Sequence, residues 1–198
     1  MAGSAADRAS ILVAAAAAAI RRGDIVAFPT ETYYGLAVDA LDVSALARLF
    51  ALKGRGAEKS SALLVADMDM LAGLCVEVPV RAREWAARYW PGPLTIALPA
   101  RPGLPSAIVS DGCVAARVSS HPLAAALVAA VGRPITATSA NPAGASPARS
   151  PAEVAGYFSA DSLQLLDGGS TQGGAPSTVV RLRAGTVEVL RQGAIELR

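Results

Sequence analysis

The sequence predicts one α/β domain with a largely parallel or mixed sheet. Short apolar runs of strand length alternate along the chain with segments of helical periodicity, an order typical of α/β proteins. No internal repeat and no long linker divides the 198 residues, which are enough to bury one substantial core. We therefore expect residues 1–198 to fold as a single domain.

The first elements follow from stop signals and caps. An N-terminal helix is expected to end at Gly23, where glycine can take the left-handed conformation, and residues 24–28 form a buried strand. The polar residues 30–35 are expected to form a turn at the carboxyl end of that strand. Ser44 is expected to cap a helix that runs through Leu52.

The rest of the chain repeats this alternation. Further strands are expected where apolar runs are bounded by turn residues, at 62–66, 94–98, 114–118, 134–138, 163–166, 177–182 and 186–190. Helices are expected at 79–89, from His121 to about Gly132, and at 151–157. Because His121 precedes a proline at a helix start, a capping or surface role is favoured over general-base chemistry.

The charge composition excludes a protein that coats nucleic acid through a strongly basic surface, because the formal net charge is only +2. Of the 18 cationic residues, 16 are arginine and the two lysines both lie in the segment Lys53–Lys59. A GC-rich genome would explain the scarcity of lysine. Our hypothesis is that these two lysines are retained because their side chains have a chemical function.

The cysteines and the apolar runs indicate the compartment. Cys75 and Cys113 lie 38 residues apart without metal-binding spacing, so buried free thiols are expected instead of a disulfide or a zinc site. The longest apolar run has ten residues, about half of what a membrane span requires. We expect a soluble, cytoplasmic protein without a membrane segment.

Three polar segments follow expected strands, or the helix after one, at 29–35, 53–59 and 138–141, and could converge on one rim of the sheet. In the second, Arg55 offers a bidentate fork and the lysines offer point charges for phosphate, although a solvated basic turn is the alternative. In the third, Ser139 and Asn141 either bond nearby backbone groups in a turn or hold a nucleotide or acyl group. The sequence offers no pattern typical of a nucleophilic triad, a carboxylate pair or a metal site.

In order along the chain, these segments resemble the YrdC-like family, the threonylcarbamoyl-AMP synthases. The resemblance covers Gly23 to about Ile195. It rests on collinear motifs, which are Phe28–Leu36, Lys53–Arg55, Trp90–Thr95, Arg117 with His121–Pro122, Ser139–Asn141, Ser177–Thr178 and Arg191–Gly193. The resemblance implies an open, twisted, mixed sheet flanked by helices around a positively charged concave site.

The resemblance also implies a reaction. L-threonine, bicarbonate and ATP would give threonylcarbamoyl-AMP and pyrophosphate, with Mg²⁺ bound to ATP as part of the substrate complex. The product is the donor for the threonylcarbamoyladenosine modification of tRNA, which implies tRNA and a downstream threonylcarbamoyl transferase as partners. No metal or prosthetic group held by the protein itself is implied.

The family's site residues carry over by position. Lys53 and Arg55 would be catalytic through their contacts with phosphate. The residues implied around ATP are Lys53, Arg55, Lys59, Cys113, Ser139, Asn141, Ser146 and Arg191. Those implied around threonine are Thr32, Arg117, Ala137 and Ser177. A bidentate pair with the amino-acid carboxylate suits Arg117, whereas Ala137 can offer only backbone atoms to a polar group.

The sequence departs from the family pattern at several positions. Gly56, Ser60 and Ser61 replace apolar residues, Leu64 stands where some relatives have histidine, Cys113 where some have threonine, and Ala143 where serine is usual. Two alternatives stay open: a noncatalytic paralogue that binds double-stranded RNA or tRNA, and an ATP-binding relative that activates another amine or carbamoyl group. The near-neutral charge weighs against the RNA-binding alternative.

Overall fold

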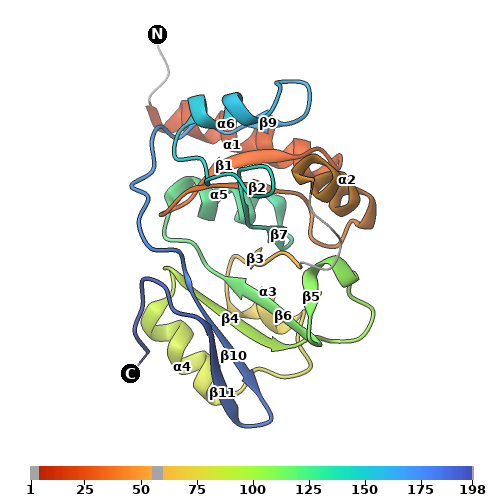
Figure 1. Ribbon diagram of the computed structural model, residues 1–198, viewed down its shortest axis with the longest axis vertical. Helices are drawn as coiled ribbons and strands as arrows, with labels where there is room; N and C mark the ends of the chain where they lie inside the picture. The colour runs from red at the N-terminus through yellow and green to blue at the C-terminus, as the bar shows by residue number, and fades with distance from the viewer. Residues whose placement is uncertain (1–4, 55–59, 198) are drawn as a thin grey trace.

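A computed structural model describes residues 5–54 and 60–197, which form two sheets (Figure 1). The first sheet has the strand order β8-β2-β1-β9, with β1 Val26–Pro29, β2 Tyr34–Ala37, β8 Thr138–Ser139 and β9 Gln164–Leu165. The second has the order β11-β10-β4-β6-β3-β7, and β5 also pairs with β6. Its bounds are β3 Leu63–Leu64, β4 Leu94–Pro99, β5 Val109–Ser110, β6 Cys113–Arg117, β7 Ile135–Thr136, β10 Thr178–Arg183 and β11 Thr186–Arg191.

Helices flank both sheets, so the expected α/β class is confirmed. They are α1 Ala5–Arg21, α2 Val43–Lys53, α3 Met68–Ala72, α4 Val80–Tyr89, α5 Pro122–Val131 and α6 Pro151–Tyr157, with a 3₁₀ turn at Ser106–Ile108. In Figure 1, α1, α5 and α6 lie with the first sheet and α4 with the second. Both sheets contain parallel and antiparallel pairs and neither closes on itself. The mixed, open arrangement is therefore confirmed, but the strands divide between two sheets instead of forming one.

Thr136 joins the two sheets. It lies on β7, at the end of the second sheet, and its buried hydroxyl donates to the main-chain oxygen of Leu36 on β2 at 3.0 Å. The same hydroxyl accepts from the amide of Val38 at 3.1 Å, and the amide of Thr136 donates to the oxygen of Val38. The chain just beyond β2 therefore pairs with β7, and this junction fixes how the sheets meet.

Apolar side chains form a core on each side of this junction. One cluster packs α1 and α5 against β1 and includes Ile20, Phe28 and Leu127. The other runs from β2 and α2 through β3, β4 and α4 and includes Leu49, Ile96 and Trp85. Burial of these side chains is the main stabilising contribution to the fold.

Several expected boundaries are confirmed and others are wrong. The helix at 151–157 has the expected bounds, and His121 caps α5 by accepting from the amide of Leu123 at 3.3 Å. However, Asp42 caps α2 in place of Ser44, because its carboxylate accepts from the amides of residues 44 and 45. The run 134–138 is not one strand, since it crosses from one sheet to the other as β7 and β8.

Four short elements were missed by the sequence analysis, namely β2, α3, the 3₁₀ turn at Ser106–Ile108 and β5. The polar residues 30–35 form only a short loop, because β2 begins at Tyr34 and pairs antiparallel with β1. The single turn of helix α3, capped by Asp67, was also not expected. All four are short, so hydrophobic periodicity gives them little signal.

In the described ranges 5–54 and 60–197, none of the helices has the length and apolarity needed to traverse a bilayer. Cys75 and Cys113 are both buried free thiols, as the sequence predicts. Burial is the main cause that raises the pKa of each, to about 12 for Cys75.

Candidate functional site

A cavity of about 500 Å³ lies between the two sheets and receives residues from both. The loop between β1 and β2 and the segment around β8 line it from the first sheet, and β4, β6, β10 and β11 line it from the second. Its sequence-predicted lining residues are Thr32, Arg117, Ala137, Ser139, Ser177 and Arg191. The structure therefore brings together side chains that are up to 159 positions apart in the chain.

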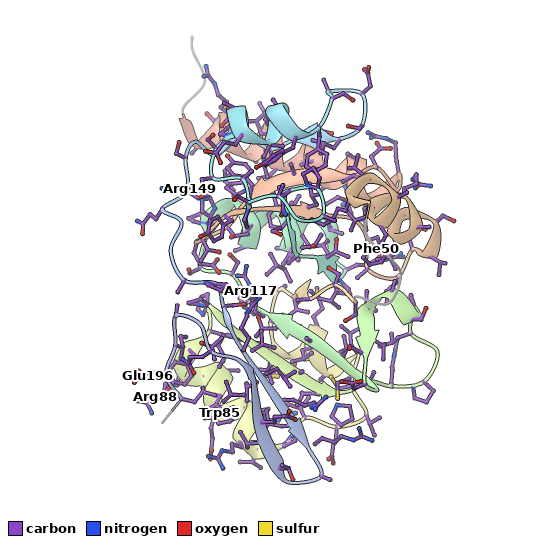
Figure 2. The ribbon with its side chains drawn as sticks, in the orientation of Figure 1. Phe50, Trp85, Arg88, Arg117, Arg149 and Glu196 are labelled. Atoms are coloured by element: carbon purple, nitrogen blue, oxygen red, sulfur yellow. The ribbon has the colours of Figure 1, made fainter. Side chains whose placement is uncertain are left out.

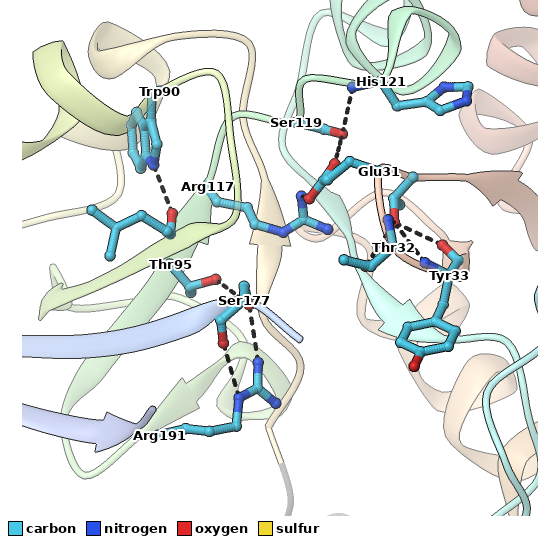
Figure 3. Close-up of polar contacts among 12 residues, drawn as sticks. Glu31, Thr32, Tyr33, Trp90, Thr95, Arg117, Ser119, His121, Ser177 and Arg191 are labelled. Carbon is cyan, nitrogen blue, oxygen red and sulfur yellow. Dashed lines mark hydrogen bonds and ion pairs between the residues drawn. The ribbon is translucent and has the colours of Figure 1, made fainter. Parts of the chain in front are cut away.

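The loop between β1 and β2 is held by its own side chains. The hydroxyl of Thr30 accepts from the amides of Thr32 and Tyr33, each at 3.3 Å, and donates to the oxygen of Tyr33 at 2.7 Å. Such local bonds favour a tight polar turn over a continued strand. They fix Thr32 at the wall of the cavity, with Glu31 beside it (Figure 3).

Arg117 is the buried cation of the cavity. It ends β6 with 8% of its surface exposed, and its side chain lies between the two sheets (Figure 2). Burial lowers its pKa, and the adjacent carboxylate of Glu31, which accepts from Nη1, opposes this effect. The other N–H groups of the Arg117 guanidinium have no partner among residues 5–54 and 60–197, and the side chain lines the cavity. An anion with two oxygens fits such a group.

Arg191 and Ser177 meet across the strands β10 and β11. Arg191 donates from Nε to the main-chain oxygen of Ser177 at 3.0 Å and from Nη2 to its hydroxyl at 2.9 Å. Thr95 on β4 donates to the same hydroxyl at 3.0 Å (Figure 3). A residue expected on the ATP side is thus bonded to one expected on the threonine side, and both line the cavity.

Gly193 allows the main chain of the Arg191–Gly193 motif to pack closely against residues 176–178. A Cβ at this position would lie 2.1 Å from the main-chain oxygen of Pro176 and 2.6 Å from the carbonyl carbon of Ser177. The amide of Gly193 instead donates to the hydroxyl of Thr178 at 3.0 Å. Only glycine fits this approach, which gives a physical reason for the Arg191–Gly193 motif.

Lys53, Ser139 and Asn141 come together at the end of α2. Lys53 is 3% exposed, and its ammonium donates to the main-chain oxygens of Ser139 and Asn141, the latter at 2.7 Å. The side-chain amide of Asn141 donates to the oxygens of Pro142 and Ala145. The structural interpretation of this segment, a turn held by its side chains, is thus confirmed for Asn141.

Some expected site residues are not placed at the cavity. Arg55 and Lys59 lie outside the described residues. Lys53 and Asn141 lie next to Ser139, a lining residue, but do not line the cavity themselves, and Ser146 is exposed. Cys113 begins β6, on the same strand as Arg117, and is buried outside the lining.

The sequence analysis missed three residues of this site. Glu31 and Ser119 form the hydrogen-bonded support of Arg117, and Thr95 bonds Ser177. Glu31 and Thr95 lie inside motifs that the sequence analysis quoted, which was the available signal. Their roles depend on which strands are neighbours in the sheet, and the motifs alone do not contain that information.

The electrostatics of the cavity favour an anion. Two guanidinium groups, of Arg117 and Arg191, line it, and Glu31 is bound to the first. Across the part of the chain that the structure describes, no three His, Cys, Asp or Glu side chains are grouped so as to hold a metal ion. The polar groups at this cavity are those that bind carboxylates and phosphates.

Two known proteins with similar sequences carry the same name. A protein of Pyrococcus abyssi named threonylcarbamoyl-AMP synthase is 40% identical over 183 residues, which are 92% of this chain and 54% of that protein. A protein of Chromohalobacter salexigens with the same name is 42% identical over 184 residues, which are 91% of this chain and 96% of that protein.

A solved structure agrees with these relatives. The crystal structure of Pyrococcus abyssi Sua5 complexed with L-threonine matches with a TM-score of 0.88 and 39% identity, over 93% of this chain and 54% of that one. The chain spans about half the length of the Pyrococcus abyssi relatives and nearly the full length of the Chromohalobacter salexigens relative. Residues 18–193 match the Sua5/YciO/YrdC family, described as "Telomere recombination", and the chain belongs to that family.

Proposed function

We propose that the chain is a threonylcarbamoyl-AMP synthase, a nucleotidyltransferase that converts L-threonine, bicarbonate and ATP into threonylcarbamoyl-AMP and pyrophosphate. The observation that carries the proposal is the buried guanidinium of Arg117 at a cavity between the two sheets. It is supported by relatives that carry this enzyme's name and by a relative solved with L-threonine.

The threonine side of the proposed site is the wall formed by Thr32, Arg117, Ala137 and Ser177. Arg117 would take the amino-acid carboxylate, because its remaining N–H groups can form a bidentate pair. The cavity of about 500 Å³ has room for an amino acid together with part of a nucleotide. The methyl side chain of Ala137 leaves its backbone atoms as the polar groups at that point.

The ATP side of the proposed site is the corner with Ser139 and Arg191, which line the cavity. Lys53, bonded to the main-chain oxygen of Asn141, would border this side, and the family resemblance adds Ser146. Buried polar atoms are usually paired, and the buried Oδ1 of Asn141 has no hydrogen-bond partner in the described ranges, so a donor on the nucleotide would satisfy it. Arg55 and Lys59 complete this side by the family resemblance and would neutralise phosphate charge together with Mg²⁺ carried by ATP. Cys113, at the start of the strand that ends in Arg117, would be a neighbour of this side.

The proposed mechanism requires little acid or base catalysis by side chains of the protein. The amine of threonine attacks CO₂ with loss of a proton, or bicarbonate with loss of water, to give a carbamate. A carbamate oxygen then attacks the α-phosphorus of ATP, and the bond to the β,γ-diphosphate breaks as pyrophosphate leaves. Positioning of the two substrates and neutralisation of phosphate charge by cations supply most of the rate in such a reaction.

The cytoplasmic location, the tRNA and the downstream threonylcarbamoyl transferase are also part of this proposal. Threonylcarbamoyl-AMP is a mixed anhydride, so an acceptor amine must consume it. The buried free thiols of Cys75 and Cys113 suit a reducing compartment.

Release of pyrophosphate tests the proposal. Purified protein with ATP, Mg²⁺, bicarbonate and a panel of amino acids should release pyrophosphate with L-threonine and much less with L-serine or L-valine. Equal release without an amino acid would contradict the threonine assignment. Absence of release, together with strongly salt-dependent binding of tRNA, would instead favour the noncatalytic paralogue.

A further inference from the structure

Glu31 holds the buried guanidinium of Arg117 from behind the cavity. It follows β1 in the short loop before β2, and its side chain is only 14% exposed and is not part of the cavity wall. Oε1 accepts from Nη1 of Arg117, and Oε2 accepts from the hydroxyl of Ser119 (Figure 3). Both oxygens of Glu31 are therefore engaged by residues of the segment that leads from β6 to α5.

Ser119 extends this chain of contacts to a helix end. Ser119 is 3% exposed, and its hydroxyl also accepts from the amide of His121 at 3.2 Å. His121 is the residue that caps α5. The orientation of the Glu31 carboxylate is thus fixed by the start of α5, and that carboxylate in turn fixes the guanidinium plane of Arg117.

A buried cation without a partner is costly, and its side chain would turn toward water. The Glu31 carboxylate removes this cost while occupying one terminal nitrogen of Arg117. The other donors of the guanidinium are left for a ligand in the cavity. A guanidinium held on one side by a carboxylate can pair with a second carboxylate on the other side.

We propose that Glu31 is a positioning residue for the amino-acid carboxylate: it holds the guanidinium of Arg117 in the plane that the substrate requires, and Ser119 holds Glu31. The inference rests on the proposed function, because it takes the carboxylate of L-threonine as the ligand of Arg117. It adds two residues, Glu31 and Ser119, that act on substrate binding without touching the substrate.

The direction of the effect follows from the charge of the substrate. Threonine is a zwitterion without net charge, so removal of the Glu31 charge changes its long-range attraction little. The loss of a fixed guanidinium then dominates, and threonine binds more weakly. Ser119→Ala keeps the Glu31 charge and removes one hydrogen bond, so it separates orientation from charge.

The test compares Michaelis constants for the two substrates in variants of the full chain. Glu31→Gln should raise the KM for L-threonine about tenfold, the loss expected for one hydrogen bond to a charged group, and Ser119→Ala about threefold. The KM for ATP should stay within about twofold in both. Asp39→Asn is the matched control, because Asp39 is also ion-paired with an arginine, Arg133 at 3.1 Å, but does not line the cavity. Both Michaelis constants should be unchanged in this control.

A double-mutant cycle distinguishes positioning from a general structural role. If Glu31 acts through Arg117, then Glu31→Gln should not raise the threonine KM further in an Arg117→Ala background. An additional tenfold rise there would overturn the inference. So would a threonine KM within about twofold of wild type in both Glu31→Gln and Ser119→Ala. A wild-type protein without threonine-dependent pyrophosphate release would instead overturn the proposed function, and the inference with it.

Discussion

The ammonium nitrogen of Lys53 lies 2.7 Å from the main-chain oxygen of Asn141, although 88 residues separate them in the chain. The same ammonium donates to the oxygen of Ser139, and the amide of Ala143 donates to the oxygen of Lys53 at 2.8 Å. Lys53 therefore ties the end of α2 to the loop that carries two other residues expected around ATP. Its charge also suits the carboxyl end of a helix.

Lys53→Met should disturb both the fold and the nucleotide side. It keeps the length of the side chain but leaves buried carbonyl oxygens without a donor, so we expect the free energy of unfolding to fall by about 1–3 kcal/mol. The KM for ATP should rise, because the 139–143 loop is no longer held. Urea unfolding and ATP-dependent pyrophosphate release measure the two effects.

Arg48→Met is the matched control for this prediction. Arg48 lies on the same helix and donates to the main-chain oxygen of Gly23 at 2.7 Å, and it is not part of the cavity wall. We expect it to lower stability without changing the KM for ATP. If Lys53→Met also left the KM for ATP unchanged, Lys53 would have only a structural role.

Arg191→Lys should weaken ATP binding at the corner of the cavity where Arg191 meets Ser177. Lysine keeps the charge but cannot bond the main-chain oxygen and the hydroxyl of Ser177 together in one plane, as Arg191 does. We expect the KM for ATP to rise about tenfold, corresponding to about 1.4 kcal/mol. Arg181→Lys is the control, because Arg181 pairs with Asp111 and Glu188 away from the cavity. Equal effects of the two substitutions would contradict a specific role for Arg191.

Tyr34→Phe should lower the free energy of unfolding more than Tyr33→Phe does. The hydroxyl of Tyr34 donates to the oxygen of Gly169 at 2.7 Å and accepts from the amide of Gly168, and its ring is fully buried. The hydroxyl of Tyr33 makes one exposed bond to the oxygen of Gly174. Thermal unfolding should show a loss of about 1–3 kcal/mol for Tyr34→Phe and under about 1 kcal/mol for Tyr33→Phe. The reverse order would show that the 168–174 segment is not held by Tyr34.

Alkaline destabilisation should depend on Cys75. Burial raises the pKa of its thiol from 9.0 to about 12, so the unfolded chain loses this proton first as the pH rises. The contribution of the protonated Cys75 thiol to the free energy of unfolding is therefore fully present below pH 9.0 and is lost between pH 9.0 and about pH 12. Between pH 9 and pH 10, wild type should lose about 1 kcal/mol more stability than Cys75→Ala. Parallel stability curves for the two proteins would contradict this prediction.

Local sequence patterns predict the class of fold and most helices and strands, and the family resemblance points to six of the side chains that line the cavity. Apolar periodicity located α4 and α6 to within a residue, and Thr32, Arg117, Ser177 and Arg191 stand in motifs that can be read directly. These features are local, because they depend on neighbours within a few residues along the chain.

How the strands divide and what supports the site depend on tertiary contacts. The run 134–138 reads as one strand, but the bonds of Thr136 to β2 split it between two sheets. Likewise, Lys53 reads as an exposed cation, but the 139–141 loop encloses it. Glu31 supports the site because the folded chain places it beside Arg117, which is 86 positions away in the sequence. Such contacts arise from which strands become neighbours, and that choice is made by packing of the whole chain and not by any one segment.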